Sequence, residues 1–370
     1  MNASINRLNH LTNKEIVLIR CLLNRFPWNV VRPIISSLGL SSGHGKEKTI
    51  DKILTAMDDL KSSKPQKFAR TIDKINDLLF SQFLYGDKAL YSISVDDADL
   101  KIIKINIEKE WLGKKQKNKI SDVLIDESSL SKTQKNELEL LHYSNNKTQS
   151  LILFSSVRDQ LIRETLPPST VPGFKDYDEI IAKKKIKKQC FDSCMIDFVS
   201  KKINIMIDLS GGISASDSLF PKSVVLRKFS DYLGRNLDYS EKDFFSLIEP
   251  ICEQTLAPYN SLDYRVFDLS FHTREGTSHK EKKSDSSKDL RDDIFNVAGI
   301  KASGKIGLYR IGIRIERSNP DLQLYDNLEL LIPGTLRRYL SGGKTSPVTY
   351  AIINNCITRS DFETLTKFIL

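Results

Sequence analysis

The sequence predicts an α+β protein in which an all-helical N-terminal domain precedes a mixed or antiparallel β-sheet with flanking helices. Between residues 12 and 83, apolar residues recur at helical spacing, as in Ile16, Ile19 and Leu23. After Gly86, segments with alternating apolar residues and many β-branched side chains become common, which is typical of strands. With 40% hydrophobic and 28% charged residues, the chain has the composition of a globular protein rather than of a disordered or fibrous one.

Four units are expected along the 370 residues. Residues 1–87 form the helical domain. Residues 88–165 form a small α/β domain, with strands in ALYSISV, LKIIKINI and LILFSSV and a helix from Gln134 to His142. Residues 166–188 form a basic connector, because LPPSTVPG contains three prolines that interrupt helices and strands.

The fourth unit, residues 189–370, is an α+β C-terminal domain. Its first two strands are joined by a tight turn near residues 200–202, and helices are expected around 223–232 and 241–256. Further strands are expected in DYRVFDLSFH, GLYRIGIRIER and NLELLI, and helices in LRRYL and SDFETLTKFIL. Residues 273–289 are dominated by Lys, Ser, Asp and Glu, which predicts a long solvated loop.

The charge balance favours an anionic partner. The excess of 56 Lys and Arg over 47 Asp and Glu leaves a net charge of +9, a bias toward polyanions such as nucleic acid. The five cysteines are odd in number and scattered, as is typical of reduced thiols in a cytoplasmic or nuclear protein. Because the sequence has no apolar signal core and no long apolar run, neither export nor membrane association is expected.

Residues 28–57 predict a helix, a turn and a second helix. Gly39 can adopt the positive φ that ends the first helix. Ile50, Ile53 and Leu54 then return an apolar face to it. The lysines of the second helix, at positions 46, 48 and 52, stay on the solvent side.

This segment resembles the SAP family of small DNA-binding motifs. The residues that fit the family pattern are Leu38, Gly39, Leu40, Gly43, Lys46, Ile50, Ile53 and Leu54. Pro33 within the first helix and the extra His44-Gly45 in the turn depart from it. The resemblance implies contact with the backbone of duplex DNA through a helix N-terminus and its lysines. The alternative is an ordinary two-helix element that packs on its neighbours.

The order of units also resembles the plan of centromere protein N, a chromatin-binding kinetochore component. The similarity lies in a helical N-terminal domain followed by a basic, sheet-containing region. It extends to no individual motif.

Three further clusters of cations are expected to bind phosphates. The densest has five lysines within six residues, the second lies beside Trp111, and the third combines a strand with the following helix. The alternative for the first is a solubilising helix face, and for the second a loop that the aromatic residue simply anchors. With the lysines of the two-helix segment, the candidate nucleic-acid-binding residues are Lys46, Lys48, Lys52, Lys114, Lys115, Lys183, Lys184, Lys185, Lys187, Lys188, Arg310, Arg314, Arg337 and Arg338.

The sequence contains no complete catalytic motif, so no catalytic residue, metal or cofactor is expected. The function predicted is that of a non-catalytic nucleic-acid-binding subunit, with DNA as the first choice of ligand, in a larger protein assembly of the defence, repair or chromatin type. One alternative is a scaffold that binds proteins only. The other is a magnesium-dependent nuclease, with ligands from Asp208, Asp263, Asp268 and Glu275.

Overall fold

The computed structural model describes residues 8–114, 119–255, 257–284, 288–304 and 306–370. The N-terminal part is helical, as predicted. Thr12 caps the first helix, since its side chain accepts the backbone N–H of Glu15 while the Glu15 carboxylate accepts the N–H of Thr12. Pro65 begins the fourth helix, where its missing N–H costs nothing. The helices are α1 (Asn13–Arg25), α2 (Trp28–Ser37), α3 (Lys46–Ser63) and α4 (Pro65–Tyr85).

Within the described residues, the strands form one 11-stranded antiparallel sheet in the order β2-β3-β4-β5-β1-β11-β10-β9-β7-β8, with β6 paired to β1. The mixed α+β class is therefore confirmed. The strands are β1 (Lys88–Ser94), β2 (Glu139–Asn145), β3 (Gln149–Leu166), β4 (Ile180–Asp197), β5 (Lys202–Asp208), β6 (Ser240–Glu241), β7 (Arg265–His272), β8 (Ser278–Lys282), β9 (Gly307–Asn319), β10 (Leu324–Ile332) and β11 (Tyr350–Asn354).

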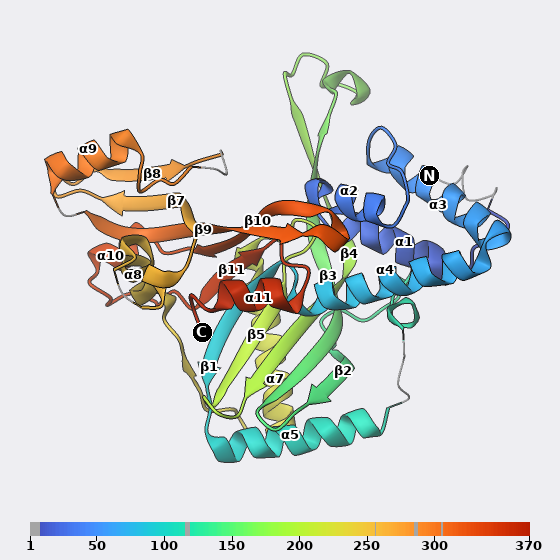
Figure 1. Ribbon diagram of the computed structural model, residues 1–370, viewed down its shortest axis with the longest axis horizontal. Coiled ribbons are helices and arrows are strands. Elements are labelled where there is room, and N and C mark those ends of the chain that lie inside the picture. Colours follow the sequence, from blue (N-terminus) through green and yellow to red (C-terminus); the bar gives the residue numbers. More distant parts are fainter. Residues whose placement is uncertain (1–7, 115–118, 256, 285–287, 305) are drawn as a thin grey trace.

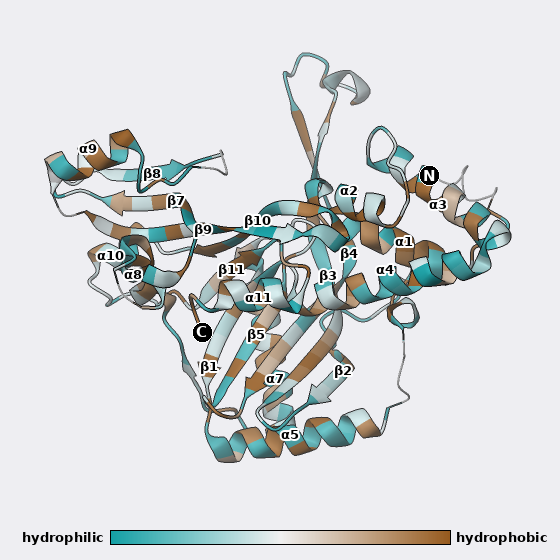
Figure 2. Ribbon diagram, in the orientation of Figure 1, coloured by the Kyte–Doolittle hydropathy of each residue, from teal (hydrophilic) through white to brown (hydrophobic). Residues whose placement is uncertain are grey.

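Helices cover both faces of the first half of the sheet (Figure 1). On one face, α5 (Asp97–Leu112) and α7 (Leu219–Leu233) pack on residues such as Tyr91 and Ile205. On the other, α4 and α11 (Arg359–Thr366) pack on residues such as Leu90 and Met206. Both faces of these strands are thus buried, and Figure 2 shows hydrophobic segments alternating with polar ones along them.

Strand β1 lies at the centre of the sheet. It pairs with β5 on one side and with β11 on the other, so that Leu90 lies opposite both Met206 and Ala351. Its first residue, Lys88, is fully buried, and its Nζ donates to the carbonyls of Phe83 at 2.6 Å and Phe191 at 2.7 Å. The sheet is therefore held together by strands that are far apart in the sequence.

The segment LKIIKINI was expected to be a strand, and this prediction was wrong. It lies in α5, where Leu100, Ile103 and Ile107 are buried at helical spacing. Ile102 and Ile105 face outward and are 42% and 50% exposed. Exposed isoleucines between buried ones imitate a buried strand in the sequence, although packing on the sheet selects the helical period.

The helix expected from Gln134 to His142 was also wrong, because β2 begins at Glu139. Its Leu140 and Tyr143 are buried and pair with Phe154 and Ile152 of β3. Pairing with the edge of β3 overrides the helical preference of the Glu and Leu residues in this segment.

Residues 166–188 are not a connector. They form the tip and the second strand of one hairpin, in which β3 and β4 pair from Gln149 and Asp197 to Leu166 and Ile180. The prolines do interrupt regular structure, but only at the turn. The sheet therefore runs without a break through the two units expected at 88–165 and 189–370.

The long loop expected at residues 273–289 contains the edge strand β8, which pairs with β7. Its burial alternates between exposed and half-buried, which explains the polar composition. Residues 285–287 of that loop lie outside the described residues. Strand β11 was not predicted, whereas β5, α7, β7, β9, β10, α10 (Leu336–Leu340) and α11 were. No described helix has the length and the apolar character needed to cross a membrane.

Candidate nucleic-acid interface

A groove of about 570 Å³ lies between the N-terminal helices and the base of the β3–β4 hairpin. Its walls are α1, the start of α3, the loop around α6 (Glu127–Leu130) and residues 186–189 of β4. Lys46, Lys187 and Lys188 line it. The groove therefore brings together two of the predicted clusters, from α3 and β4, that are far apart in the sequence.

Helix α1 adds two arginines that sequence reasoning missed. Arg20 is half-buried in the groove, and its Nε has no hydrogen-bond partner in the described part of the chain. Arg25 is buried; its Nη2 donates to Asp208 Oδ2 at 2.7 Å and its Nε donates to Gln82 Oε1 at 2.9 Å. Its guanidinium also lies 4.7 Å from the ring centroid of Phe83. These contacts fix α1 against β5 and so set one wall of the groove.

Asp208 ends β5 and is fully buried. Burial by itself would raise the pKa of its carboxyl, but the positive charges of Arg25, Lys88 and Lys188 outweigh burial and hold that pKa well below its usual range. The carboxylate also accepts the backbone N–H of Phe191 at 2.8 Å. Asp208 therefore balances buried cations and is not a free metal ligand.

Two lysines of β4, Lys187 and Lys188, have no carboxylate partner among the described residues. Lys187 Nζ donates to the carbonyls of Ser131 at 2.7 Å and Thr133 at 2.9 Å, and Lys188 Nζ donates to the carbonyl of Ser210. Neither lysine forms an ion pair with another described residue. Both therefore remain available to an anion.

On the opposite wall, Asp126 is occupied by its own helix. Its carboxylate accepts the Ser128 hydroxyl and the backbone N–H of Ser129 at the start of α6, and these bonds lower its pKa to about 2. Asp126 thus serves to start α6 rather than to neutralise the lysines of β4.

The outer half of the hairpin projects beyond the rest of the molecule (Figure 1). We call it the arm; it comprises residues 159–187, which include the outer parts of β3 and β4 and the turn between them. Eight residues of an extended strand, from 159 to 166, span roughly 25 Å. A paired ribbon of this kind needs support from other chain segments, or from a ligand, to be rigid.

One side of the arm carries cations that no carboxylate neutralises. Arg163 lies opposite Lys183 in the ladder, and Lys185 lies two residues further along β4, so the three side chains share a face. None of them forms an ion pair with a described residue. On the other face, Lys184 pairs with Glu164 at 2.6 Å. The predicted lysine cluster is thus divided between the groove and the arm.

Helices α2 and α3 form the two-helix element predicted at residues 28–57. The turn between them is held by Thr49, whose Oγ1 accepts the backbone N–H of Gly43 at 2.9 Å and donates to the carbonyl of Gly45 at 2.7 Å. Lys46, Lys48 and Lys52 are exposed, as predicted. Of these three, Lys46 lines the groove.

The arginine cluster of the C-terminal half is largely neutralised by ion pairs. The pairs are Arg310 with Asp268, Arg314 with Glu329, and Arg338 with Asp243. Arg337 is exposed and has no ion pair among the described residues. The arginines that alternate along β9 therefore form ion pairs with neighbouring strands, and their binding of phosphates stays a prediction.

The cluster beside Trp111 lies next to α5, away from the groove. Lys114 pairs with Glu110 at 3.1 Å and donates to the carbonyl of Leu140 at 3.3 Å. Lys115 lies outside the described residues.

The carboxylates considered for a nuclease do not come together. Asp208 ends β5, which four strands separate from β7, where Asp268 is paired with an arginine. Asp263 precedes β7, and Glu275 lies in the turn before β8. Over the ranges that the structure describes, no group of three or more His, Cys, Asp and Glu side chains is placed to hold a metal ion.

No model of a known protein family matches the chain, and no curated protein matches it in sequence. The resemblance of α2 and α3 to the SAP family therefore stays a prediction that rests on their own residues. The geometry of the groove and the arm carries the functional argument.

Proposed function

We propose that the protein binds nucleic acid, with duplex DNA as the first choice, through the groove and the arm. The observation that carries this proposal is the meeting of Lys46 with Lys187 and Lys188 in one groove. Arg163, Lys183 and Lys185, which form no ion pair with any described residue, continue that cationic surface along the arm. Such a surface follows a phosphate backbone and makes few contacts that distinguish bases.

Within this proposal the protein is one subunit of a larger assembly. Helix α9 (Ile294–Ser303) lies beside the edge strand β8 (Figure 1) and supports this part. Its Ile294, Phe295 and Val297 side chains are 87%, 69% and 51% exposed. Exposed apolar residues next to an unpaired strand edge are typical of a protein-binding surface.

Fluorescence anisotropy with labelled duplex DNA, single-stranded DNA and RNA across a salt series tests the binding proposal. The Lys183→Glu/Lys185→Glu variant should weaken duplex binding. It should also reduce the slope of log K against log salt by about 2, because two phosphate contacts are lost. Parallel reactions with added Mg²⁺ test whether the DNA is cleaved, which only the nuclease alternative predicts.

The matched control is Lys109→Glu/Lys147→Glu, which makes the same change of charge. Lys109 lies on α5 and Lys147 lies in the turn between β2 and β3, both exposed and at the opposite end of β3 from the arm. If the two variants weaken DNA binding equally, the loss of affinity arises from the change in net charge and not from the arm. Absence of binding near 150 mM salt, roughly physiological, would favour the scaffold that binds proteins only.

A further inference from the structure

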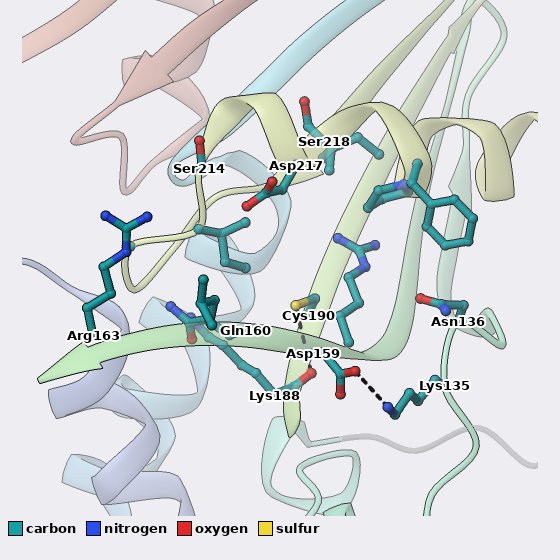
Figure 3. A pocket seen from close by; sticks show the side chains of 17 residues that line it. Lys135, Asn136, Asp159, Gln160, Arg163, Lys188, Cys190, Ser214, Asp217 and Ser218 are labelled. Carbon is teal, nitrogen blue, oxygen red and sulfur yellow. Dashed lines mark hydrogen bonds and ion pairs between the residues drawn. The ribbon is translucent and has the colours of Figure 1, made fainter. Parts of the chain in front are cut away.

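A second cavity, of about 580 Å³, adjoins the groove at the base of the arm. It lies between the β3–β4 hairpin and the segment that leads into α7. Figure 3 shows Ser214 and Asp217 on one side of it and Gln160 and Lys188 on the other. DNA binding as proposed above involves Arg163 and Lys188 of its wall but not its interior, since a duplex is too large to enter it.

Two cations lie side by side in its wall. Arg158 and Lys188 are directly opposite each other in the ladder between β3 and β4, an arrangement that is unfavourable for like charges. Arg158 is only 9% exposed; its Nη2 pairs with Asp192, but its buried Nη1 has no partner among the described residues. Lys188 forms no ion pair in that part of the chain. The two buried carboxylates here, Asp192 and Asp208, thus face four cations, because Asp208 also balances Arg25 and Lys88.

The backbone is shaped around the Lys188 amine. Gly211 has φ of +66°, and a Cβ at this position would collide with Lys188 Nζ. Gly212 follows with φ of +84°. The two glycines therefore let the loop after β5 pass close to the amine and keep it at the cavity.

The acids that line the cavity do not supply the missing negative charge. Asp159 is paired with Lys135 at 2.6 Å, and Asp217 is exposed at the rim. Burial lowers the pKa of the Lys188 amine and of the Arg158 guanidinium, since it disfavours their charged forms. Charges held in this way are stabilised by an anion that shares their site.

We propose that this cavity binds a phosphomonoester, with the phosphate between Arg158 and Lys188. A planar guanidinium and an ammonium together match the oxygens of a dianionic phosphate. The rest of the ligand lies against Leu161, Ile213 and Phe220, which form an apolar part of the wall. The phosphate belongs either to a free metabolite such as a nucleotide or to a phosphorylated side chain of a partner.

Isothermal titration calorimetry of the full chain with inorganic phosphate, against chloride at equal ionic strength, tests the phosphate binding that both sources share. Lys188→Gln should weaken phosphate binding about 10-fold or more, as expected for the loss of a charge-assisted hydrogen bond. Lys187→Gln is the matched control and should leave the affinity unchanged, because Lys187 faces the groove instead. Equal affinities of the two variants would overturn the proposal.

A gain of affinity provides a test that does not depend on a damaged site. Asp217→Asn removes the acid at the rim, so it should strengthen phosphate binding several-fold while the fold is kept. An unchanged affinity would count against a phosphate in this cavity.

Two further titrations identify the source of the phosphate. Adenosine monophosphate and a phosphoserine peptide should differ in affinity. The probe that binds more tightly than inorganic phosphate shows whether the ligand is a nucleotide or a phosphorylated side chain. If neither does, an apolar contact with the ligand body is ruled out. The Lys183→Glu/Lys185→Glu variant should keep phosphate binding when it loses DNA binding, so the two proposals fail separately.

Discussion

At the scale of single residues, the contact between Arg25 and Asp208 decides how the helices meet the sheet. Both side chains are buried and their charged atoms are 2.7 Å apart. Arg25→Met leaves the Asp208 carboxylate buried without its main partner, so we expect a loss of about 3–5 kcal/mol in the free energy of unfolding. Urea denaturation followed by circular dichroism measures it.

The double variant Arg25→Met/Asp208→Asn checks that cause. It removes both charges, so it should recover a large part of the stability lost by Arg25→Met alone. If the double variant is as unstable as the single one, the loss arises from packing rather than from an unpaired charge.

Lys88 should make the free energy of unfolding change with pH in the alkaline range. Burial lowers the pKa of its amine to about 8, although the charge of Asp208 acts in the opposite direction. The unfolded chain, with a lysine pKa near 10.4, binds more protons between these values, so this contribution to stability rises with pH from about 8 to about 10. Relative to Lys88→Met, the wild type should gain up to about 3 kcal/mol over that range.

Urea unfolding at pH 7, 8, 9 and 10 measures this difference. Comparison with the variant removes the contributions of the other groups that titrate in the same range. A difference that stays constant with pH would mean that Lys88 remains charged throughout in the folded protein.

At the scale of elements, the turn between α2 and α3 depends on one hydroxyl. Thr49 is fully buried and bonds to the backbone of Gly43 and Gly45. Thr49→Val keeps the shape but leaves the Gly43 N–H without its partner, so it should cost about 1–3 kcal/mol. Thr55→Val on the exposed side of α3 should cost less than about 0.5 kcal/mol, and thermal unfolding compares the two.

The sequence identified most elements of this fold but not their partners. Helix α5 was mistaken for a strand because Ile102 and Ile105 are apolar and yet exposed, and no local pattern distinguishes them from buried residues. The prolines at the tip of the arm marked a break correctly. Such a break can be a linker between two domains or the turn of one hairpin. Strand pairing between distant residues decides which it is, and the hydrophobic periodicity of the sequence does not reveal that pairing.

The candidate site was predicted in part, for the same reason. Lys46 was found from the two-helix segment at residues 28–57, and Lys187 and Lys188 from the local density of lysines. Arg163 belongs to the cationic side of the arm only because it lies opposite Lys183. Predicting it would have required the register between β3 and β4. The ion pairs of Arg310 and Arg314 on β9 could not be predicted, since their carboxylates come from neighbouring strands.

At the scale of the whole molecule, the helices and the sheet should unfold together. Arg25 and the stacked rings of Phe83 and Phe191, with centroids 3.7 Å apart, join the two layers. The two tryptophans report separately, because Trp28 lies in α2 and Trp111 in α5. Fluorescence of the single-tryptophan variants Trp111→Phe and Trp28→Phe should therefore give the same urea midpoint. Separate midpoints would show that the helical part unfolds independently.

The central position of β1 sets an order of events during synthesis. This strand is the first to emerge, yet its partners β5 and β11 begin at Lys202 and Tyr350. At about 5 to 20 residues per second, β1 waits roughly 10 to 50 s for its last partner. During that time its free edge is open to wrong pairing. The newly made chain therefore depends on the N-terminal helices, and on any factor that shields strand edges, until β11 has been translated.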